Sequence, residues 1–289
     1  MGPTRDGHGA AGDPAIEPLR ASDPAGLRFF LQSRFTRESL RRHLSLNPGL
    51  SWRVVSSGQY VVGGFWRRRP EIAAVVELDS GPFRRALLER LIAAARGLGC
   101  ELVVAELSIP PGEAAGWSDV GFEPVDTIHE YERRGTAYEP LAAPPPPIRR
   151  YRPDDLRPVL ALEARSFPWL WRNSTAELAH YAEAHETELW VLEQAGALTG
   201  YVGLTIRGDH GHLDRLAVDP DRRRGGLGSG LVAAALDRFA ARRVRRITLT
   251  TQHDNVRAQP IYRRFGFRPT GGQLTIYGRW LGRARDRTP

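Results

Sequence analysis

The stretch from Val218 to Gly230 reads VDPDRRRGGLGSG and decides how the rest of the chain is interpreted. Before it, His212–Val218 is strand-like. After it, apolar residues keep helical spacing at Leu227, Leu231, Val232, Ala235, Leu236 and Phe239. Backbone N–H groups at a helix start converge on an anion, and glycines let the backbone come close to it. The stretch therefore predicts a site for a phosphate-bearing ligand. The alternative is a glycine-rich turn beside a solvated basic segment.

The same order of elements occurs twice. The helical spacing recurs 144 residues earlier, at Phe83, Leu87, Leu88, Leu91, Ile92 and Ala95. Each helix is followed by a strand-like run, Glu101–Leu107 or Arg246–Thr251, and then by Gly-Phe-x-Pro at Gly121 or Gly266. The preceding strands, Ile72–Leu78 and His212–Val218, align best at an offset of 140. The N-terminal copy therefore lacks about four residues in the loop before its helix.

A proline-rich segment separates the copies. Four consecutive prolines, Pro144 to Pro147, favour a stiff extended spacer. We therefore expect a disordered leader over residues 1–24, an N-terminal domain over 25–138, a linker over 139–147, a C-terminal domain over 148–281 and a polar tail over 282–289.

Composition limits the possible classes of protein. One cysteine, Cys100, excludes a disulfide framework and a cysteine-rich metal site, so we expect no metal. No apolar run is long enough to cross a bilayer, and residues 1–26 do not read as a signal peptide, so we expect a cytoplasmic protein without a membrane partner. The net charge is +8, and every cation is an arginine. Of the dense clusters, Arg67–Arg69 and Arg242–Arg246 are expected to be solvated surface.

Patterns in the C-terminal half predict a mixed α/β domain. We expect a strand at Arg149–Arg152, helices at Pro153–Ser166 and Ser174–Ala184, and a hairpin of Leu189–Glu193 with Leu198–Ile206. With the strand, helix and strand described above, the order becomes β-α-α-β-β-β-α-β-α-β.

Two motifs carry a family resemblance. Arg223-x-x-Gly226-x-Gly228, followed by Asn255-x-x-Ala258-x-x-x-Tyr262-x-x-x-Gly266-Phe267, resembles the GCN5-related N-acetyltransferase (GNAT) superfamily over residues 148–281. The resemblance implies an α/β fold of two tandem acetyltransferase-like domains. Each would be a mixed, mostly antiparallel sheet flanked by helices. It also implies an acyl-CoA-dependent N-acyltransferase that moves an acetyl group from acetyl-CoA to an amine on a small molecule or peptide.

The resemblance also assigns residues to the co-substrate. The pyrophosphate of coenzyme A would lie at the loop, the pantetheine arm along the strand, and the thiol end beside the second motif. The strand is expected to bulge and splay from its neighbour to open a slot. The residues so assigned are Leu216, Ala217, Val218, Arg223, Arg224, Gly225, Gly226, Leu227, Gly228, Ser229, Asn255 and Ala258.

Catalytic and acceptor residues follow from the same resemblance. Tyr262 matches the usual general acid, which protonates the leaving thiolate. His212 and Asp214 alternate on the strand, should face one side, and are candidates for the base, with His210 and His253 as weaker ones. Some ribosomal-protein acetyltransferases carry a glutamate where this chain has Thr250. The loop between the first two helices predicts acceptor contacts from Trp169, Trp171 and Asn173; packing in the core is the alternative for each tryptophan.

The N-terminal copy lacks the polar site residues and the glycine-rich loop. Its counterparts of His212, Asp214 and Tyr262 are the apolar residues Ile72, Ala74 and Trp117, and its loop shrinks to Asp79–Pro82. We therefore interpret it as a degenerate acetyltransferase-like domain, in a tandem arrangement similar in architecture to mycothiol synthase. The alternative function is a non-catalytic module that binds coenzyme A or nucleic acid. Nucleic acid is disfavoured because no reading motif is present.

Overall fold

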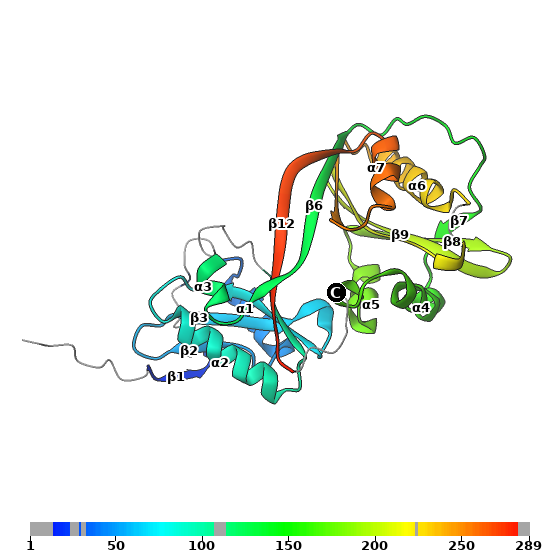
Figure 1. Ribbon diagram of the computed structural model, residues 1–289. Coiled ribbons are helices and arrows are strands. Elements are labelled where there is room, and N and C mark those ends of the chain that lie inside the picture. The colour runs from blue at the N-terminus through cyan, green and yellow to red at the C-terminus, as the bar shows by residue number, and fades with distance from the viewer. Residues whose placement is uncertain (1–13, 24–28, 30–32, 107–113, 223–224, 283–289) are drawn as a thin grey trace, which may run out of the picture. The chain divides into compact units, whose positions relative to one another are not determined.

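The structure is a computed structural model that describes residues 14–23, 29, 33–106, 114–222 and 225–282 (Figure 1). These residues form two compact units. Unit 1 holds the chain up to Trp66, then Pro70–Glu123 and the segment from Gly278. Unit 2 holds Pro124–Tyr277 together with the short segment Arg67–Arg69. The units divide the chain at other places than the proline-rich linker, and the domain boundaries expected from sequence remain predictions.

The described residues of unit 1 form a sheet with three α-helices. Its strands pair in the order β1 (Ile16–Pro18), β2 (Trp52–Val54), β3 (Tyr60–Phe65), β4 (Ile72–Leu78) and β5 (Leu102–Ala105). Its helices are α1 (Arg37–Leu46), α2 (Arg84–Gly97) and α3 (Ala114–Ser118). The apolar positions of α2 named from sequence are buried at Leu87, Leu88, Leu91, Ile92 and Ala95. The short β1 lies within residues 1–24, the stretch expected to be a disordered leader. There, Ile16–Pro18 pair antiparallel with Val54–Trp52 of β2.

Unit 2 contains the predicted order of elements. Its strands are β6 (Glu123–Arg134, of which Glu123 belongs to unit 1), β7 (Ile148–Arg150), β8 (Thr187–Gln194), β9 (Ala197–Arg207), β10 (His210–Val218), β11 (Arg246–Gln252) and β12 (Arg268–Trp280, of which Gly278–Trp280 belong to unit 1). They are hydrogen-bonded in the order β12-β6-β11-β10-β9-β8-β7. The helices are α4 (Leu156–Ser166), α5 (Thr175–Glu183), α6 (Leu227–Ala241) and α7 (Ala258–Arg264).

Two hydrophobic clusters fix the layers of unit 2. On one face of the sheet, α6 and α7 bury residues such as Leu231, Leu236 and Phe239. On the other face, Val159 of α4 and Leu178 of α5 pack on Tyr201 of β9. Figure 1 shows the same arrangement, with the sheet between the two helix pairs. Because the described strand pairs are antiparallel except for β4–β5 and β10–β11, the predicted mixed and mostly antiparallel fold is confirmed.

The last strand of each sequence copy pairs with the other copy. Strand β6 ends the N-terminal copy, yet its residues Ile128–Arg134 pair antiparallel with Gln252–Arg246 of β11. Strand β12 ends the C-terminal copy, yet its residues Gly278–Trp280 pair with Val104–Leu102 of β5 in unit 1. The periodicity of the sequence predicts a strand after each Gly-Phe-x-Pro but says nothing of its partner. We call this feature the strand exchange.

Candidate functional site

A fork between β10 and β11 opens the site. The two strands pair in parallel from His210 with Arg246 to Leu213 with Leu249. Strand β10 then bulges between Leu213 and Arg215 and continues along β9, without further pairs to β11 among the described residues. The splay and bulge that the resemblance implied are therefore confirmed.

A cavity of about 710 Å³ lies at the fork. It gathers most residues assigned to the co-substrate, from three separate elements. Those lining it are Leu216, Ala217, Val218, Gly226, Leu227, Gly228, Ser229, Asn255 and Ala258. Gly225 is described but does not line the cavity, and Arg223 and Arg224 lie outside the described residues. Residues of the two motifs, which are separate in the sequence, therefore line one cavity.

The start of α6 forms one wall. Gly226 is its N-cap, with φ of 73°, and no side chain caps the helix among the described residues. A Cβ added at Gly226 would point into open space, whereas one at Gly228 would lie 3.1 Å from Cδ1 of Ile261. The first-turn N–H groups have no partner within a helix and carry its positive dipole end. This wall can therefore receive an anion close to the backbone.

Tyr262 on α7 also lines the cavity. Its side chain is 5% exposed and packs edge-on to Phe267, with ring centroids 6.1 Å apart. Burial raises the pKa of Tyr262 to about 12, so the hydroxyl is protonated at neutral pH. A phenol held in this state in a cavity wall can serve as a proton donor.

His212 and Asp214 face the same side of the sheet, as predicted. The Nδ1 atom of His212 lies 2.8 Å from the Thr248 hydroxyl. The Asp214 carboxylate accepts hydrogen bonds from the hydroxyls of Tyr181 (2.6 Å) and Thr205 (2.7 Å). Burial raises the pKa of Asp214. Neither residue lines the cavity, but both lie where the fork begins, one residue before Leu213 and one after it.

The predicted acceptor residues lie in and after a short 3₁₀ helix, Trp169–Trp171. The indole N–H of Trp171 donates to the Asp126 carboxylate, and Asn173 is hydrogen-bonded to Glu163. The cavity is lined instead by Phe167 and Pro168 of the same loop. None of Trp169, Trp171 and Asn173 lines the cavity, and acceptor contacts by these residues remain predictions.

Sequence reasoning missed polar residues of unit 2 that precede the proline-rich linker in the chain. The prediction that Arg67–Arg69 is solvated surface is wrong for Arg69, which is 6% exposed. Its guanidinium packs over the ring of Trp169. His129 of β6 lies with its Nε2 atom 2.8 Å from Nδ1 of His253. Arg69 and His129 are revealed only by the strand exchange and tertiary packing.

The counterpart positions in unit 1 belong to its core. Ile72, Ala74 and Trp117 are each 0% exposed. At the shortened loop, a Cβ added to Gly81 would lie 1.2 Å from the Gln59 side chain, so that turn is already filled. Within the described residues, no group of three or more His, Cys, Asp or Glu side chains could hold a metal ion. None of the described helices is long and apolar enough to cross a membrane.

Comparisons with known proteins agree with this geometry. The acetyltransferase (GNAT) family matches residues 156–267. The putative ribosomal protein bS18-alanine N-acetyltransferase of Bacillus subtilis (strain 168) is 32% identical over 132 residues, which are 45% of this chain and 85% of the relative. The mycothiol acetyltransferase of Clavibacter sepedonicus is 36% identical over 128 residues, and the match spans only 42% of either chain.

A solved structure shares the fold of both units. The tandem GNAT protein from the clavulanic acid biosynthesis pathway is 20% identical, with a TM-score of 0.60, over 94% of this chain and 100% of the other. The tandem arrangement expected from the repeated pattern is thus confirmed. The chain belongs to the acetyltransferase (GNAT) family and is an acyl-CoA-dependent N-acyltransferase.

Proposed function

We propose that this enzyme transfers an acetyl group from acetyl-CoA to an amine of a small molecule or peptide, with Tyr262 as the general acid. One observation carries the proposal. The buried, protonated phenol of Tyr262 and the glycine-rich start of α6 line the same cavity, at the fork where β10 leaves β11.

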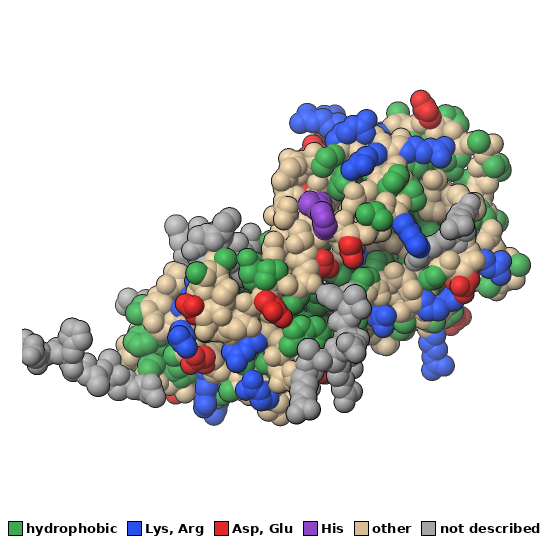
Figure 2. Space-filling view, in the orientation of Figure 1, with side chains coloured by type: hydrophobic (Ala, Val, Ile, Leu, Met, Phe, Trp, Pro, Cys, Tyr) green, Lys and Arg blue, Asp and Glu red, His purple; other side chains and the backbone are tan. Residues whose placement is uncertain are grey.

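The residues of the cavity fit acetyl-CoA. The N–H groups from Gly226 to Ser229 would hold the pyrophosphate, with Arg223 and Arg224 of the same loop as counter-charges. Beyond the bulge, the β11-facing edge of Leu216–Val218 has no ladder partner among the described residues and can pair with the pantetheine amides. Figure 2 also shows arginine side chains over α6 and α7, interspersed with acidic and apolar ones rather than forming one basic face.

The proposed chemistry is direct attack. The amine nitrogen forms a bond to the thioester carbonyl carbon, and the carbon–sulfur bond breaks. Tyr262 gives its proton to the departing sulfur. His212 takes the proton lost by the amine, through water, because it lies at the start of the fork but outside the cavity. Asp214 lies on the same face of the sheet as His212, and its carboxylate accepts hydrogen bonds from the hydroxyls of Tyr181 and Thr205.

Replacing Gly226 with valine should weaken acetyl-CoA binding while the protein still folds. A β-branched side chain would project from the N-cap into the space where the pyrophosphate is expected. The left-handed φ adds a backbone penalty of about 1–2 kcal/mol. Gly208→Val is the matched control, because Gly208 also has a left-handed φ of 60° and open space, but lies outside the cavity lining. Calorimetry should show lost affinity only in Gly226→Val. Equal affinity in both folded variants would contradict the placement of the pyrophosphate.

A panel of amines tests the function itself. Full-length protein is incubated with acetyl-CoA and, in turn, an alanine-initiated peptide, lysine, spermidine and glucosamine. Thiol release is followed continuously, and the acetylated amine is identified by mass spectrometry. Amine-dependent thiol release with a matching acetylated product is the expected result. Acetyl-CoA binding without turnover on any amine would favour the non-catalytic coenzyme-A-binding alternative.

A further inference from the structure

Two of three consecutive arginines, Arg67 and Arg69, contact the loop that lines the cavity. The Arg67 guanidinium lies 5.2 Å from the centroid of the Trp171 ring and donates a 2.8 Å hydrogen bond to Oδ1 of Asn173. The Arg69 guanidinium lies 4.6 Å from the centroid of the Trp169 ring. Arg69 also donates a hydrogen bond to the backbone carbonyl of Trp169.

Arg68, between them, reaches the helix that follows the loop. Its Nε atom lies 3.3 Å from the carboxylate of Glu177, in the first turn of α5. The backbone is left-handed at both Arg67 and Arg68, with φ of 50° and 52°. This conformation costs about 1–2 kcal/mol for each residue with a Cβ and persists where the surroundings fix it. The segment is therefore held by its side-chain contacts.

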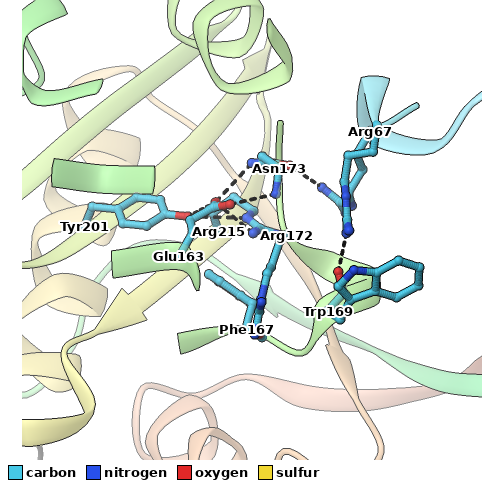
Figure 3. A network of polar contacts seen from close by, with 9 residues as sticks. Arg67, Glu163, Phe167, Trp169, Arg172, Asn173, Tyr201 and Arg215 are labelled. Carbon is cyan, nitrogen blue, oxygen red and sulfur yellow. Dashed lines mark hydrogen bonds and ion pairs between the residues drawn. The ribbon is translucent and has the colours of Figure 1, made fainter. Parts of the chain in front are cut away.

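The contacts of Arg67 continue into a buried network (Figure 3). Asn173 donates from its backbone N–H (2.8 Å) and from Nδ2 (3.0 Å) to the Glu163 carboxylate. Glu163 also accepts a 2.8 Å hydrogen bond from Arg215 and a hydrogen bond from the Tyr201 hydroxyl. Burial lowers the pKa of Arg67 to about 10, so its guanidinium is charged at neutral pH.

The network ends at the cavity wall. The Arg215 guanidinium lies 3.8 Å from the centroid of the Phe167 ring. Phe167 and its neighbour Pro168 line the same cavity as Asn255 and Tyr262. A continuous chain of contacts thus runs from Arg67 through Asn173, Glu163 and Arg215 to Phe167.

We propose that Arg67, Arg68 and Arg69 act together as a positioning element, the arginine clamp, which holds residues 167–173 so that Phe167 and Pro168 shape the acceptor side of the cavity. The clamp acts through the loop and touches no reacting atom. The binding of the acceptor amine therefore depends on Arg67–Arg69, which precede β4 in the chain. The binding of acetyl-CoA does not depend on them. Only the description of this wall as the acceptor side rests on the proposed function.

Hydrogen–deuterium exchange on the full chain tests the clamp without a ligand. In Arg67→Ala, peptides covering 167–173 should take up deuterium faster, while peptides from α6 should not change. Arg67→Lys keeps a cation and a donor, so it should restore at least about half of the lost protection. Arg134→Ala is the control, because the Arg134 side chain is 88% exposed, and it should match the parent protein. Unchanged uptake over 167–173 in folded Arg67→Ala would overturn the clamp.

Kinetics separate the clamp from the proposed reaction. With the fastest amine of the panel, Arg67→Ala should raise the KM for the amine about tenfold or more. The reason is that displaced Phe167 and Pro168 would no longer position the acceptor. The KM for acetyl-CoA should change less than about twofold. Equal increases in both constants, despite faster exchange in the loop, would limit the clamp to a structural role and overturn its link to the acceptor. Failure of every amine would instead count against the proposed function and leave the exchange result valid.

Discussion

Tyr262→Phe is expected to lower turnover by about 10²–10⁴-fold while leaving the affinity for acetyl-CoA unchanged. The ring lines the cavity, and the raised pKa of about 12 keeps its proton in place at neutral pH. The sulfur that would take this proton gains negative charge only as the carbon–sulfur bond breaks. Loss of the hydroxyl should therefore affect the transition state and spare ground-state binding.

A matched variant separates chemistry from packing. Tyr138→Phe removes a hydroxyl that donates to Asp237 at 3.0 Å, outside the cavity lining, and should keep full turnover. Steady-state thiol release, calorimetry with acetyl-CoA and melting temperature are measured on one preparation of each protein. A folded Tyr262→Phe enzyme with full turnover would rule out the general acid. Parallel losses of turnover and melting temperature would assign the hydroxyl a structural role.

Glu163→Ala is expected to lower the free energy of unfolding of unit 2 by about 3–5 kcal/mol. The Glu163 side chain is 1% exposed and that of its partner Arg215 is 8% exposed. Without the carboxylate, the Arg215 guanidinium would keep its burial but lose its counter-charge. The two donors of Asn173 and the hydroxyl of Tyr201 would also lose their acceptor.

Chemical denaturation followed by tryptophan fluorescence measures this effect. Glu186→Ala removes the exposed partner of Arg207 and should cost less than about 1 kcal/mol. Glu163→Ala combined with Arg215→Ala should cost less than the sum of the single variants, because the double variant buries no unpaired charge. A loss below about 1 kcal/mol in Glu163→Ala would contradict the buried network.

Local patterns in the sequence predict the parts of the site that are close together along the chain. The spacing of Leu227, Leu231 and Phe239 predicts α6 and its buried face, and the glycines before it predict the anion-binding wall. The second motif predicts Asn255 and Tyr262 as residues of the site, and both line the cavity. Each of these features depends on neighbours within one or two elements, where period and spacing are informative.

The rest depends on tertiary geometry. The alternation of residues along β10 changes at the bulge, which brings Asp214 and Arg215 to one face, beside Thr205 and Tyr201 of β9. Leu216, Ala217 and Val218 beyond it line the cavity, while Asp214 does not. Likewise, no local pattern states that the arginines beginning at Arg67 meet a loop about a hundred residues later.

The strand exchange also sets an order for biosynthesis. As the chain leaves the ribosome, β5 emerges early, but its partner residues Gly278–Trp280 are translated only after β11 and α7. Until then the Leu102–Val104 edge has unpaired N–H and C=O groups, which are templates for aggregation. The N-terminal unit, usually the first to fold in a multidomain chain, can here complete its sheet only at the end of translation. A chain that stops before Gly278 would therefore leave unit 1 with an open sheet edge at β5, even though every residue of the cavity is present.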